Sequence, residues 1–394
     1  MLHNNDHPTC GMRFQRMLNC VMGILPMHPP IKMVILLFRF RRYPAVEVFS
    51  MTKVLITGAT GFIGRSVADA AARRGMELRL LLRSDKYIDH VKHLDFERAD
   101  GDLTDPDSLR KACDGVDAVF HLAAMYSMWV KDEDLLFKVN VEGTRAMIRA
   151  ALDAGVEKFV YTSSVAAIGR RDDGQPSDET VEWNLEWTKD PYTKSKHLAH
   201  LAAREFIADG APVIITHPGA PVGWGDVKPT PTGQMYVDYI NGRIPGYFRG
   251  GFSIIDVDDC GEGHLLAYEK GRIGEGYILA NKSMWLKEIY HLTADIAGVP
   301  ERKICMPKWA AIAFGVTAEW WANNITHKSP ILTGGGARMT SMPPFYDGSK
   351  AVRELGLTFR PIRETFERAI WYFYERGMIK KKPRTGSPPV TNQT

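Results

Sequence analysis

Cysteine is scarce in this sequence, and its spacing excludes the common forms of cysteine chemistry. No Cys-x-x-Cys pair occurs, and the five cysteines in 394 residues are Cys10, Cys20, Cys113, Cys260 and Cys305. An odd number at irregular spacing argues against a disulfide framework and against a zinc site. We therefore expect no metal and a reducing compartment, the cytoplasm.

Strong charge of one sign is also absent. The formal net charge is only +4 and the basic residues are spread along the chain, so composition makes no case for binding nucleic acid. Two basic clusters, one at Arg39, Arg41 and Arg42 and one at Lys380–Lys382, are interpreted as solvated tails. Contact with an anionic surface is the alternative for both.

A long apolar run is missing as well. The run Met33–Phe38 is far shorter than the roughly 20 residues of a membrane span. Positive charges follow this run, whereas a signal peptide carries them in front of it. We expect no transmembrane segment, and we expect residues 1–50 to be a disordered extension or an over-long reading of the start.

The chain does contain a regular alternation of apolar strands and helices. Short β-rich runs predict strands at 53–57, 78–82, 118–121, 158–162 and 212–216, with a further strand ending near Gly101. Helical spacing predicts helices at 62–74, 105–113, 134–154 and 192–207. This alternation predicts an α/β fold, a doubly wound parallel Rossmann sheet with helices on both faces.

After Pro218 the alternation stops and prolines become frequent. Helices are predicted near residues 257–269, 286–297, 308–323 and 362–376. We therefore expect a Rossmann domain over 51–220, a smaller, mostly helical substrate domain over 221–378, and a disordered tail over 379–394.

The first predicted strand runs into a glycine-rich turn. Gly58 permits the tight turn, Gly61 lets the backbone approach a pyrophosphate, and Gly64 lets the helix pack on the sheet. The pyrophosphate then meets free N–H groups at the positive end of the helix. We expect a nicotinamide dinucleotide here, bound by Gly58, Thr60, Gly61, Phe62, Ile63 and Gly64.

The end of the second strand decides between the two nicotinamide cofactors. An acidic residue there would bind the ribose 2′-hydroxyl, but this chain has Arg83, which can fork a 2′-phosphate, and Lys86 could add to it. Asp85 lies two residues too late and carries the wrong sign. Arg83 therefore favours NADP(H) over NAD(H).

Two other strand ends are expected to reach the cofactor. Asp102 and Leu103 follow the third strand and would bracket the adenine, with Asp102 accepting from its amino group. Ala123 follows the fourth strand and is small enough for the backbone to pass close to the cofactor. Plain packing at a strand end remains the alternative for each residue.

Tyr192 and Lys196 are spaced i and i+4, which places both on one face of a helix. Reduction of a carbonyl needs a proton donor, and a free tyrosine, with a pKa of about 10, exchanges poorly at neutral pH. A neighbouring ammonium lowers that pKa, so Tyr192 is predicted to be the general acid or base. Ser164, at the end of the fifth strand, can hydrogen-bond the substrate carbonyl; Ser163 is the reserve.

The motifs TGATGFIG, GDL, HLAA, YTSS and YxxxK occur in this order, and the chain thereby resembles the extended short-chain dehydrogenase/reductase superfamily over about residues 52–377. The resemblance implies a Rossmann core with a small C-terminal substrate domain. It also implies a homodimer through the helices at 134–154 and 192–207. For the site it implies catalysis by Ser164, Tyr192 and Lys196, support from Asn140, and nicotinamide contacts from Pro218 and Val222.

Segments 228–233 and 271–274 look like those of the hopanoid-associated sugar epimerase subgroup, which is similar to dihydroflavonol-4-reductases. Nucleotide-sugar epimerases of this fold usually carry an arginine before their Val-Asp-Asp segment. Here the stretch Phe252–Asp259 has none, and Arg338 is a weak candidate for a second one. The expected pocket segments instead carry many aromatic residues, which favour an apolar substrate unless they belong to the core: Tyr126, Trp129, Trp183, Trp187, Trp224, Tyr236, Tyr247 and Phe248.

The sequence thus predicts an NADP-dependent oxidoreductase that reduces a ketone or aldehyde of a hydrophobic small molecule. A sugar or nucleotide-sugar epimerase or dehydratase with transient hydride transfer is the alternative, and net NADPH consumption separates the two. A protein that binds NADP(H) without catalysis is a third possibility.

Overall fold

A computed structural model describes residues 51–343 and 345–388 of the chain. The predicted extension over residues 1–50 lies outside the described residues, and so does the end of the predicted tail, residues 389–394.

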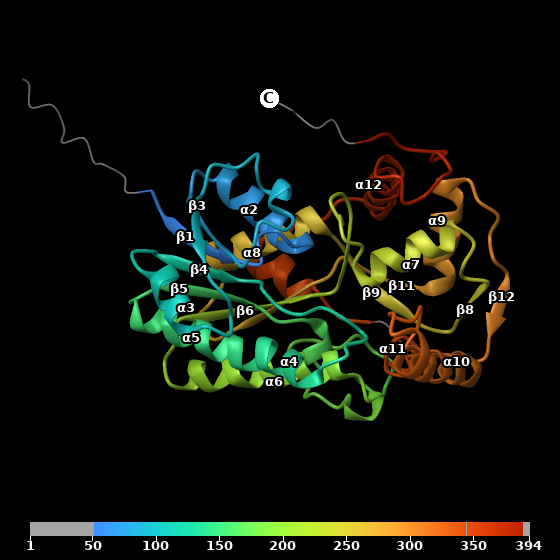
Figure 1. The fold of residues 1–394 in the computed structure, drawn as a ribbon, viewed down its shortest axis with the longest axis horizontal. Coiled ribbons are helices and arrows are strands. Elements are labelled where there is room, and N and C mark those ends of the chain that lie inside the picture. Colours follow the sequence, from blue (N-terminus) through green and yellow to red (C-terminus); the bar gives the residue numbers. More distant parts are fainter. Residues whose placement is uncertain (1–50, 344, 389–394) are drawn as a thin grey trace, which may run out of the picture. The chain divides into compact units, whose positions relative to one another are not determined.

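A seven-stranded parallel sheet forms the centre of the described part (Figure 1). Its strand order is β10-β6-β5-β4-β1-β2-β3, which reverses direction at β1 as in a doubly wound sheet. The fold class predicted from the alternation is confirmed. The bounds are β1 Lys53–Thr57, β2 Glu77–Leu82, β3 Glu97–Asp100, β4 Ala118–His121, β5 Lys158–Thr162, β6 Val213–Pro218 and β10 Gly276–Leu279.

Alternate side chains of the inner strands pack against helices on opposite faces of the sheet. Leu55 faces a cluster with residues of α3 (Pro106–Cys113), α5 (Gly143–Asp153) and α6 (Pro191–Ala208). Val54 and Ile56 face a cluster with α2 (Phe62–Arg73) and α8 (Val257–Lys270). Because both faces of the inner strands are covered, β1, β2, β4, β5 and β6 are mainly apolar runs, which is why the sequence could locate them. The edge strand β3 is charged and largely exposed.

The helix predicted over 134–154 is interrupted. It consists of α4 (Glu133–Phe137), a π-helical turn (Lys138–Glu142) and α5. A π-turn inserts an extra residue into a helix and is often found at functional sites. Here it carries Asn140, which is buried.

The C-terminal half is mostly helical, as predicted, but it also contains short strands. A three-stranded sheet is formed by β7 (Ala220–Val222), β9 (Gly251–Asp256) and β11 (Lys282–Trp285), and a pair by β8 (Gly246–Phe248) and β12 (Ile304–Met306). The helices are α7 (Pro231–Ile240), α9 (Leu286–Ala297), α10 (Lys308–Trp321), α11 (Gly334–Thr340) and α12 (Ile362–Glu375). Short single turns lie at 88–90, 165–167, 186–188, 322–326 and 351–355.

Two segments beyond residue 220 return to the central sheet, although the sequence placed them in the smaller domain. β10 pairs with β6, and α8 packs along α2. Gly261 of α8 permits this contact, because a Cβ there would lie 2.3 Å from the hydroxyl of Ser66. The predicted boundary at residue 220 marks the point where the alternation of strands and helices stops. That signal cannot show that a strand further along the chain, β10, pairs with β6 in the central sheet.

The tail was expected to be disordered from residue 379, but residues 380–388 pack on the C-terminal helices. The backbone N–H of Arg384 donates to Ile296 of α9, and the indole of Trp371 on α12 donates to Thr385 at 3.0 Å. The hydroxyl of Thr385 donates to Glu367, also on α12. The polar composition of the tail predicted disorder, because composition does not show these contacts with distant helices.

Candidate functional site

The glycine turn after β1 has the geometry that the sequence predicted. Gly58 has a positive φ of 74°, and a Cβ there would lie 2.8 Å from the backbone nitrogen of Ala123. A Cβ at Gly64 would lie 2.0 Å from the carbonyl oxygen of Gly58. A side chain at position 58 would therefore push the turn away from the end of β4. A side chain at position 64 would push α2 away from the turn.

The N-terminus of α2 is open for an anion. Gly61 caps the helix without a side-chain hydrogen bond, and the first turn, which includes Phe62 and Ile63, carries no acidic residue. Free N–H groups at a helix N-terminus bind phosphate. The residues present thus fit the diphosphate of a dinucleotide, as expected. Thr60 contributes its carbonyl to a hydrogen bond with His90 at 3.0 Å.

Ala123 lies directly against this turn. The hydroxyl of Thr57 accepts from the backbone N–H groups of Leu122 (3.2 Å) and Ala123 (3.1 Å), and it also contacts Nδ1 of His121 at 2.8 Å. Burial lowers the pKa of His121 to about 3, so the imidazole is neutral. The end of β4 is thereby held beside the end of β1, where the strand order reverses.

Arg83 and Asp102, the two residues expected to bind the adenosine half of the cofactor, lie close to each other. The side chain of Arg83 is 78% exposed and lies 3.6 Å from Asp102. Asp102 also accepts from the N–H and hydroxyl of Thr104, at 2.8 and 2.7 Å, so one carboxylate oxygen is occupied. Asp85, the residue of the wrong sign, forms an ion pair with Arg98.

Leu103 was expected to bracket the adenine, but it packs in the core. It is buried, and a Cβ at Gly143 of α5 would lie 2.9 Å from its side chain. Its side chain thus packs at the strand end, and a contact with adenine stays a prediction.

Tyr192 and Lys196 lie one turn apart at the start of α6, and both are buried. Asp190 caps this helix by accepting from Thr193 at 2.8 Å, and Pro191 occupies the first turn. The hydroxyl of Ser164 accepts from the backbone N–H of Ala166 at 3.1 Å, and it lies close enough to Tyr192 to lower the pKa of the phenol. The ammonium of Lys196 donates to the carbonyl of Thr162 at 2.9 Å.

Burial dominates the electrostatics of this group. It raises the pKa of the Tyr192 phenol well above its usual value, and the nearby hydroxyl of Ser164 offsets only part of this rise. Burial also lowers the pKa of Lys196 to about 7. The sequence predicted that the ammonium would lower the phenol's pKa, but both groups are desolvated, and desolvation disfavours the charged form of each.

Asn140 joins two parts of the site from its π-turn. Its Oδ1 accepts from the N–H of Met125 at 2.7 Å, and its Nδ2 donates to the hydroxyl of Ser195 at 3.0 Å. The amide therefore ties the loop after β4 to α6, next to Tyr192. The resemblance implied that Asn140 supports the site, and that role stays a prediction.

Pro218 and Val222 were expected to contact the nicotinamide after β6. Pro218 ends β6, and Val222 belongs to β7 and is buried. Val222 and Phe62 line the same small hollow, together with Asp226 and Tyr236.

Several polar residues of the site were not singled out from the sequence. His217 on β6 contacts the carbonyl of Ser164 at 3.2 Å, and its ring lies 5.2 Å from that of His200 on α6. Burial raises the pKa of Asp226 to about 6. The sequence signal for these residues is weak, because a lone polar residue next to an apolar run does not reveal that the fold buries it.

The eight aromatic residues expected to line one pocket lie in different parts of the structure. Tyr126 lies against Tyr192, while Trp183 stacks on His197 with ring centroids 4.1 Å apart. Trp129 donates to Asn323 at 2.7 Å, and Trp187 is exposed. Four of the eight belong to or pack on the C-terminal core: Trp224, Tyr236, Tyr247 and Phe248.

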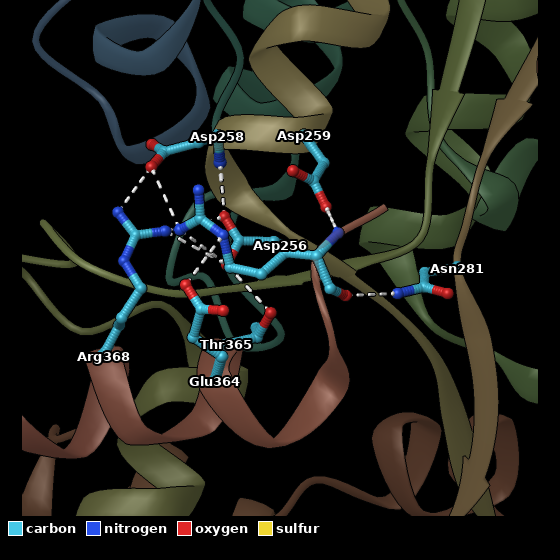
Figure 2. A network of polar contacts seen from close by, with 8 residues as sticks. Asp256, Asp258, Asp259, Asn281, Glu364, Thr365 and Arg368 are labelled. Atoms are coloured by element: carbon cyan, nitrogen blue, oxygen red, sulfur yellow. Dashed lines mark hydrogen bonds and ion pairs between the residues drawn. The ribbon is translucent and has the colours of Figure 1, made fainter. Parts of the chain in front are cut away.

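The Val-Asp-Asp segment lacks its neighbouring arginine in the sequence, but the fold supplies one from α12 (Figure 2). Arg368 contacts Asp256 at 3.2 Å and Asp258 at 2.5 Å. Asp256 is fully buried and also accepts from Thr365 at 2.9 Å. The arginine binds these carboxylates and joins α12 to the start of α8. Arg338, the other candidate, donates to the carbonyl of Thr188 at 3.4 Å.

No helix among the described residues is long and apolar enough to cross a membrane. Within the same residues, no three histidine, cysteine or acidic side chains are grouped as a metal site would require.

Comparison with known proteins identifies the family. The model of the NAD dependent epimerase/dehydratase family matches residues 54–280, more than half of the chain. The chain belongs to the NAD-dependent epimerase/dehydratase family. The prediction of an NAD(P)-dependent enzyme of the extended short-chain dehydrogenase/reductase type is thereby confirmed.

Three similar proteins show how far the likeness within this family extends. A Synechocystis protein provisionally named dihydroflavonol 4-reductase is 36% identical over 82% of this chain and 95% of its own. Sterol demethylase protein B of Methylococcus capsulatus is 30% identical over 82% of this chain and 99% of its own. A crystal structure titled gox2253 has a TM-score of 0.74 at 41% identity, covering 83% of this chain and 99% of the other.

Proposed function

We propose that this family member is an NADP-dependent reductase acting on a ketone or aldehyde of a hydrophobic small molecule. The observation that carries the proposal is the placement of buried Tyr192 and Lys196 one helical turn apart on α6, together with a glycine turn whose helix N-terminus carries no acidic residue. The bound cofactor supplies the hydride, and this chain supplies the proton and orients the carbonyl.

Tyr192 is the proposed proton donor to the carbonyl oxygen. Because burial raises the pKa of its phenol, Tyr192 holds its proton at neutral pH until negative charge develops on that oxygen. Ser164 orients the same oxygen through its hydroxyl. Lys196, with a pKa of about 7, is partly protonated near neutrality and can stabilise the phenolate that forms.

Three features support a hydrophobic substrate over a nucleotide sugar. Tyr126 covers the phenol with an aromatic ring. Arg368 is already engaged by Asp256 and Asp258, which leaves it unsuited to hold a diphosphate. Two of the similar proteins carry the names dihydroflavonol 4-reductase, given provisionally, and sterol demethylase protein B.

The preference for NADP(H) is proposed from Arg83. Its guanidinium is exposed at the end of β2, 3.6 Å from Asp102, while Asp85 forms its ion pair with Arg98. A guanidinium can bind a 2′-phosphate through two parallel hydrogen bonds.

An epimerase remains the second candidate, since the family model itself describes epimerases and dehydratases. In that case the same residues would remove a hydride and return it, with no net change in the cofactor.

The test is a turnover screen with ketones, aldehydes and nucleotide sugars, following the absorbance of reduced nicotinamide and the products together. A reductase consumes one NADPH per alcohol formed, whereas an epimerase forms a new sugar without net consumption. Tyr192→Phe should lower kcat by about 10²–10⁴-fold while the Kd of NADPH stays near that of the wild type. Tyr374→Phe, on α12, is the matched control and should keep full activity. Retention of most activity in Tyr192→Phe would refute the proposed role.

A further inference from the structure

α10 presents apolar side chains to solvent over most of its surface. Sixteen large apolar residues are exposed in the described part of the chain, and eight of them lie between Ile304 and Ile331. Trp309 is 73% exposed and Trp320 is 57% exposed. We call the following set, on α10 and the turn after it, the α10 patch: Trp309, Phe314, Val316, Trp320, Trp321 and Ile325.

A narrow strip of small residues holds this helix on the protein. Within α10 only Ala311 and Gly315 are buried, and Ala322 continues the strip. A Cβ at Gly315 would lie 2.6 Å from the carbonyl oxygen of Thr333, so the helix backbone lies close to the start of α11. A surface helix normally buries its apolar face, whereas this helix turns its bulky apolar residues outward.

The charges around the α10 patch are mainly positive. Residues 301–331 contain four basic and two acidic side chains. Of the two acids, Glu319 accepts from the backbone of Gly334 at 3.1 Å, and Glu301 contacts His291 at 3.2 Å. Lys303, Lys308 and Lys328 are exposed at the two ends of the segment that carries the apolar surface, and Lys308 also lies over the ring of Trp187. We call these three lysines the positive rim.

We propose that the α10 patch binds the surface of a lipid bilayer with anionic headgroups. Tryptophan combines an apolar ring with a polar N–H and favours the boundary between hydrocarbon and water. An interfacial helix carries such residues beside lysines that attract acidic lipids. At 14 residues α10 extends about 21 Å along its axis, which suits lying in that boundary and is too short to cross it.

The charge pattern favours a bilayer over a second copy of this chain. In a symmetric contact each patch would meet the same patch, which places the lysine rims of the two copies near each other. A bilayer of acidic lipids instead provides opposite charge for the rim and hydrocarbon for the rings.

The α10 patch is continuous with the loop that covers Tyr192. The indole of Trp129 in that loop donates to Asn323, in the turn after α10. If the proposed function is right, a bilayer bound here would lie beside the entrance used by a hydrophobic substrate. The binding itself is independent of turnover and is tested without substrate or cofactor.

The experiment is co-sedimentation of the full chain with vesicles of phosphatidylcholine, with or without phosphatidylglycerol, at low and high salt. The test variant is Trp309→Gln/Trp320→Gln, whose side chains are exposed and whose thermal unfolding should match that of the wild type. The matched control is Ile273→Gln/Val352→Gln, which removes two exposed apolar residues away from α10. A third variant, Lys303→Gln/Lys328→Gln, tests the positive rim.

The wild type and the matched control should bind vesicles that contain phosphatidylglycerol, and salt should weaken the binding. The tryptophan variant should bind at least about tenfold more weakly, because it lacks two aromatic rings that the wild type buries in the bilayer. The lysine variant should lose the preference for phosphatidylglycerol. The proposal fails if the wild type stays in solution, or if the tryptophan variant binds as well as the control. It also fails if the tryptophan substitutions only abolish self-association without vesicles, since a second copy would then cover the patch.

Discussion

The aromatic ring of Tyr126 lies 4.9 Å from that of Tyr192, inclined to it by 50°. Thr232 on α7 lies close enough to the hydroxyl of Tyr126 to lower its pKa. One residue of the loop after β4 therefore contacts both the proposed proton donor and the C-terminal half of the molecule. Burial and the neighbouring Tyr126 both raise the pKa of Tyr192.

Removing the ring of Tyr126 should shift the pH dependence of catalysis. In Tyr126→Ala water reaches Tyr192, so the phenol's pKa falls toward its usual value of about 10. Carbonyl reduction needs the protonated phenol. The fall of kcat on the alkaline side of its pH profile should therefore begin at lower pH. Tyr126→Phe keeps the ring and should leave the pH of that fall unchanged. Identical pH profiles for the Ala and Phe variants would contradict the role of ring burial.

Gly61 and Gly64 should separate cofactor binding from stability. Gly64→Ala places a Cβ 2.0 Å from the carbonyl of Gly58 and should lower the free energy of unfolding by about 1–3 kcal/mol. Gly61→Ala meets its nearest atom at 3.1 Å and should change stability by less than about 1 kcal/mol. Its Cβ should nonetheless obstruct the diphosphate and weaken NADPH binding strongly. Urea unfolding and cofactor titration measure the two effects, and equal NADPH affinity in Gly61→Ala and the wild type would refute the assigned turn.

Arg83→Ala should weaken NADPH far more than NADH. Loss of a charge-assisted hydrogen bond costs about 1.5–3 kcal/mol, or roughly 10–100-fold in Kd, and only NADPH carries the 2′-phosphate. Titration of both cofactors measures this difference. Arg353→Ala, which removes an exposed arginine near the C-terminal end of the fold, is the control and should leave both constants unchanged. If both cofactors lose affinity equally, the preference for NADP(H) does not come from this side chain.

Asp259 should make the protein less stable as the pH rises. Burial, and then the neighbouring Asp256 and Asp258, raise its pKa from the usual 3.8 to about 7. The folded state therefore holds a proton that the unfolded state has released, and stability falls between about pH 4 and pH 7.

Asp259→Asn keeps an acceptor for the N–H of Arg360, which the carboxylate binds at 2.7 Å. The variant should be more stable than the wild type at pH 8, by about 1 kcal/mol after allowing for partial exposure, and equal to it at pH 4. Denaturation at both pH values is the measurement, with Asp153→Asn as the exposed control. A gain of equal size at both values would show that charge is not the cause.

The sequence by itself determined the local parts of this protein. Strand runs such as Lys53–Thr57, the glycine turn at Gly58 and the start of α6 at Asp190-Pro191 all depend on residues within a few positions of one another. The same kind of signal marks α7, where Thr230 caps the helix and Pro231 follows, and it could have located that helix as well.

Only the tertiary structure decided how charged and apolar groups are surrounded. The partner of Asp256 is Arg368, 112 positions away, and Asp85 is neutralised by Arg98 on a neighbouring strand. The pKa of Tyr192 follows from burial, and the outward face of α10 follows from what packs against its small residues. Periodicity and capping act within one or two turns of chain and can therefore be predicted from sequence. Burial and Coulomb energy depend on distances between remote segments, which exist only once the chain has folded.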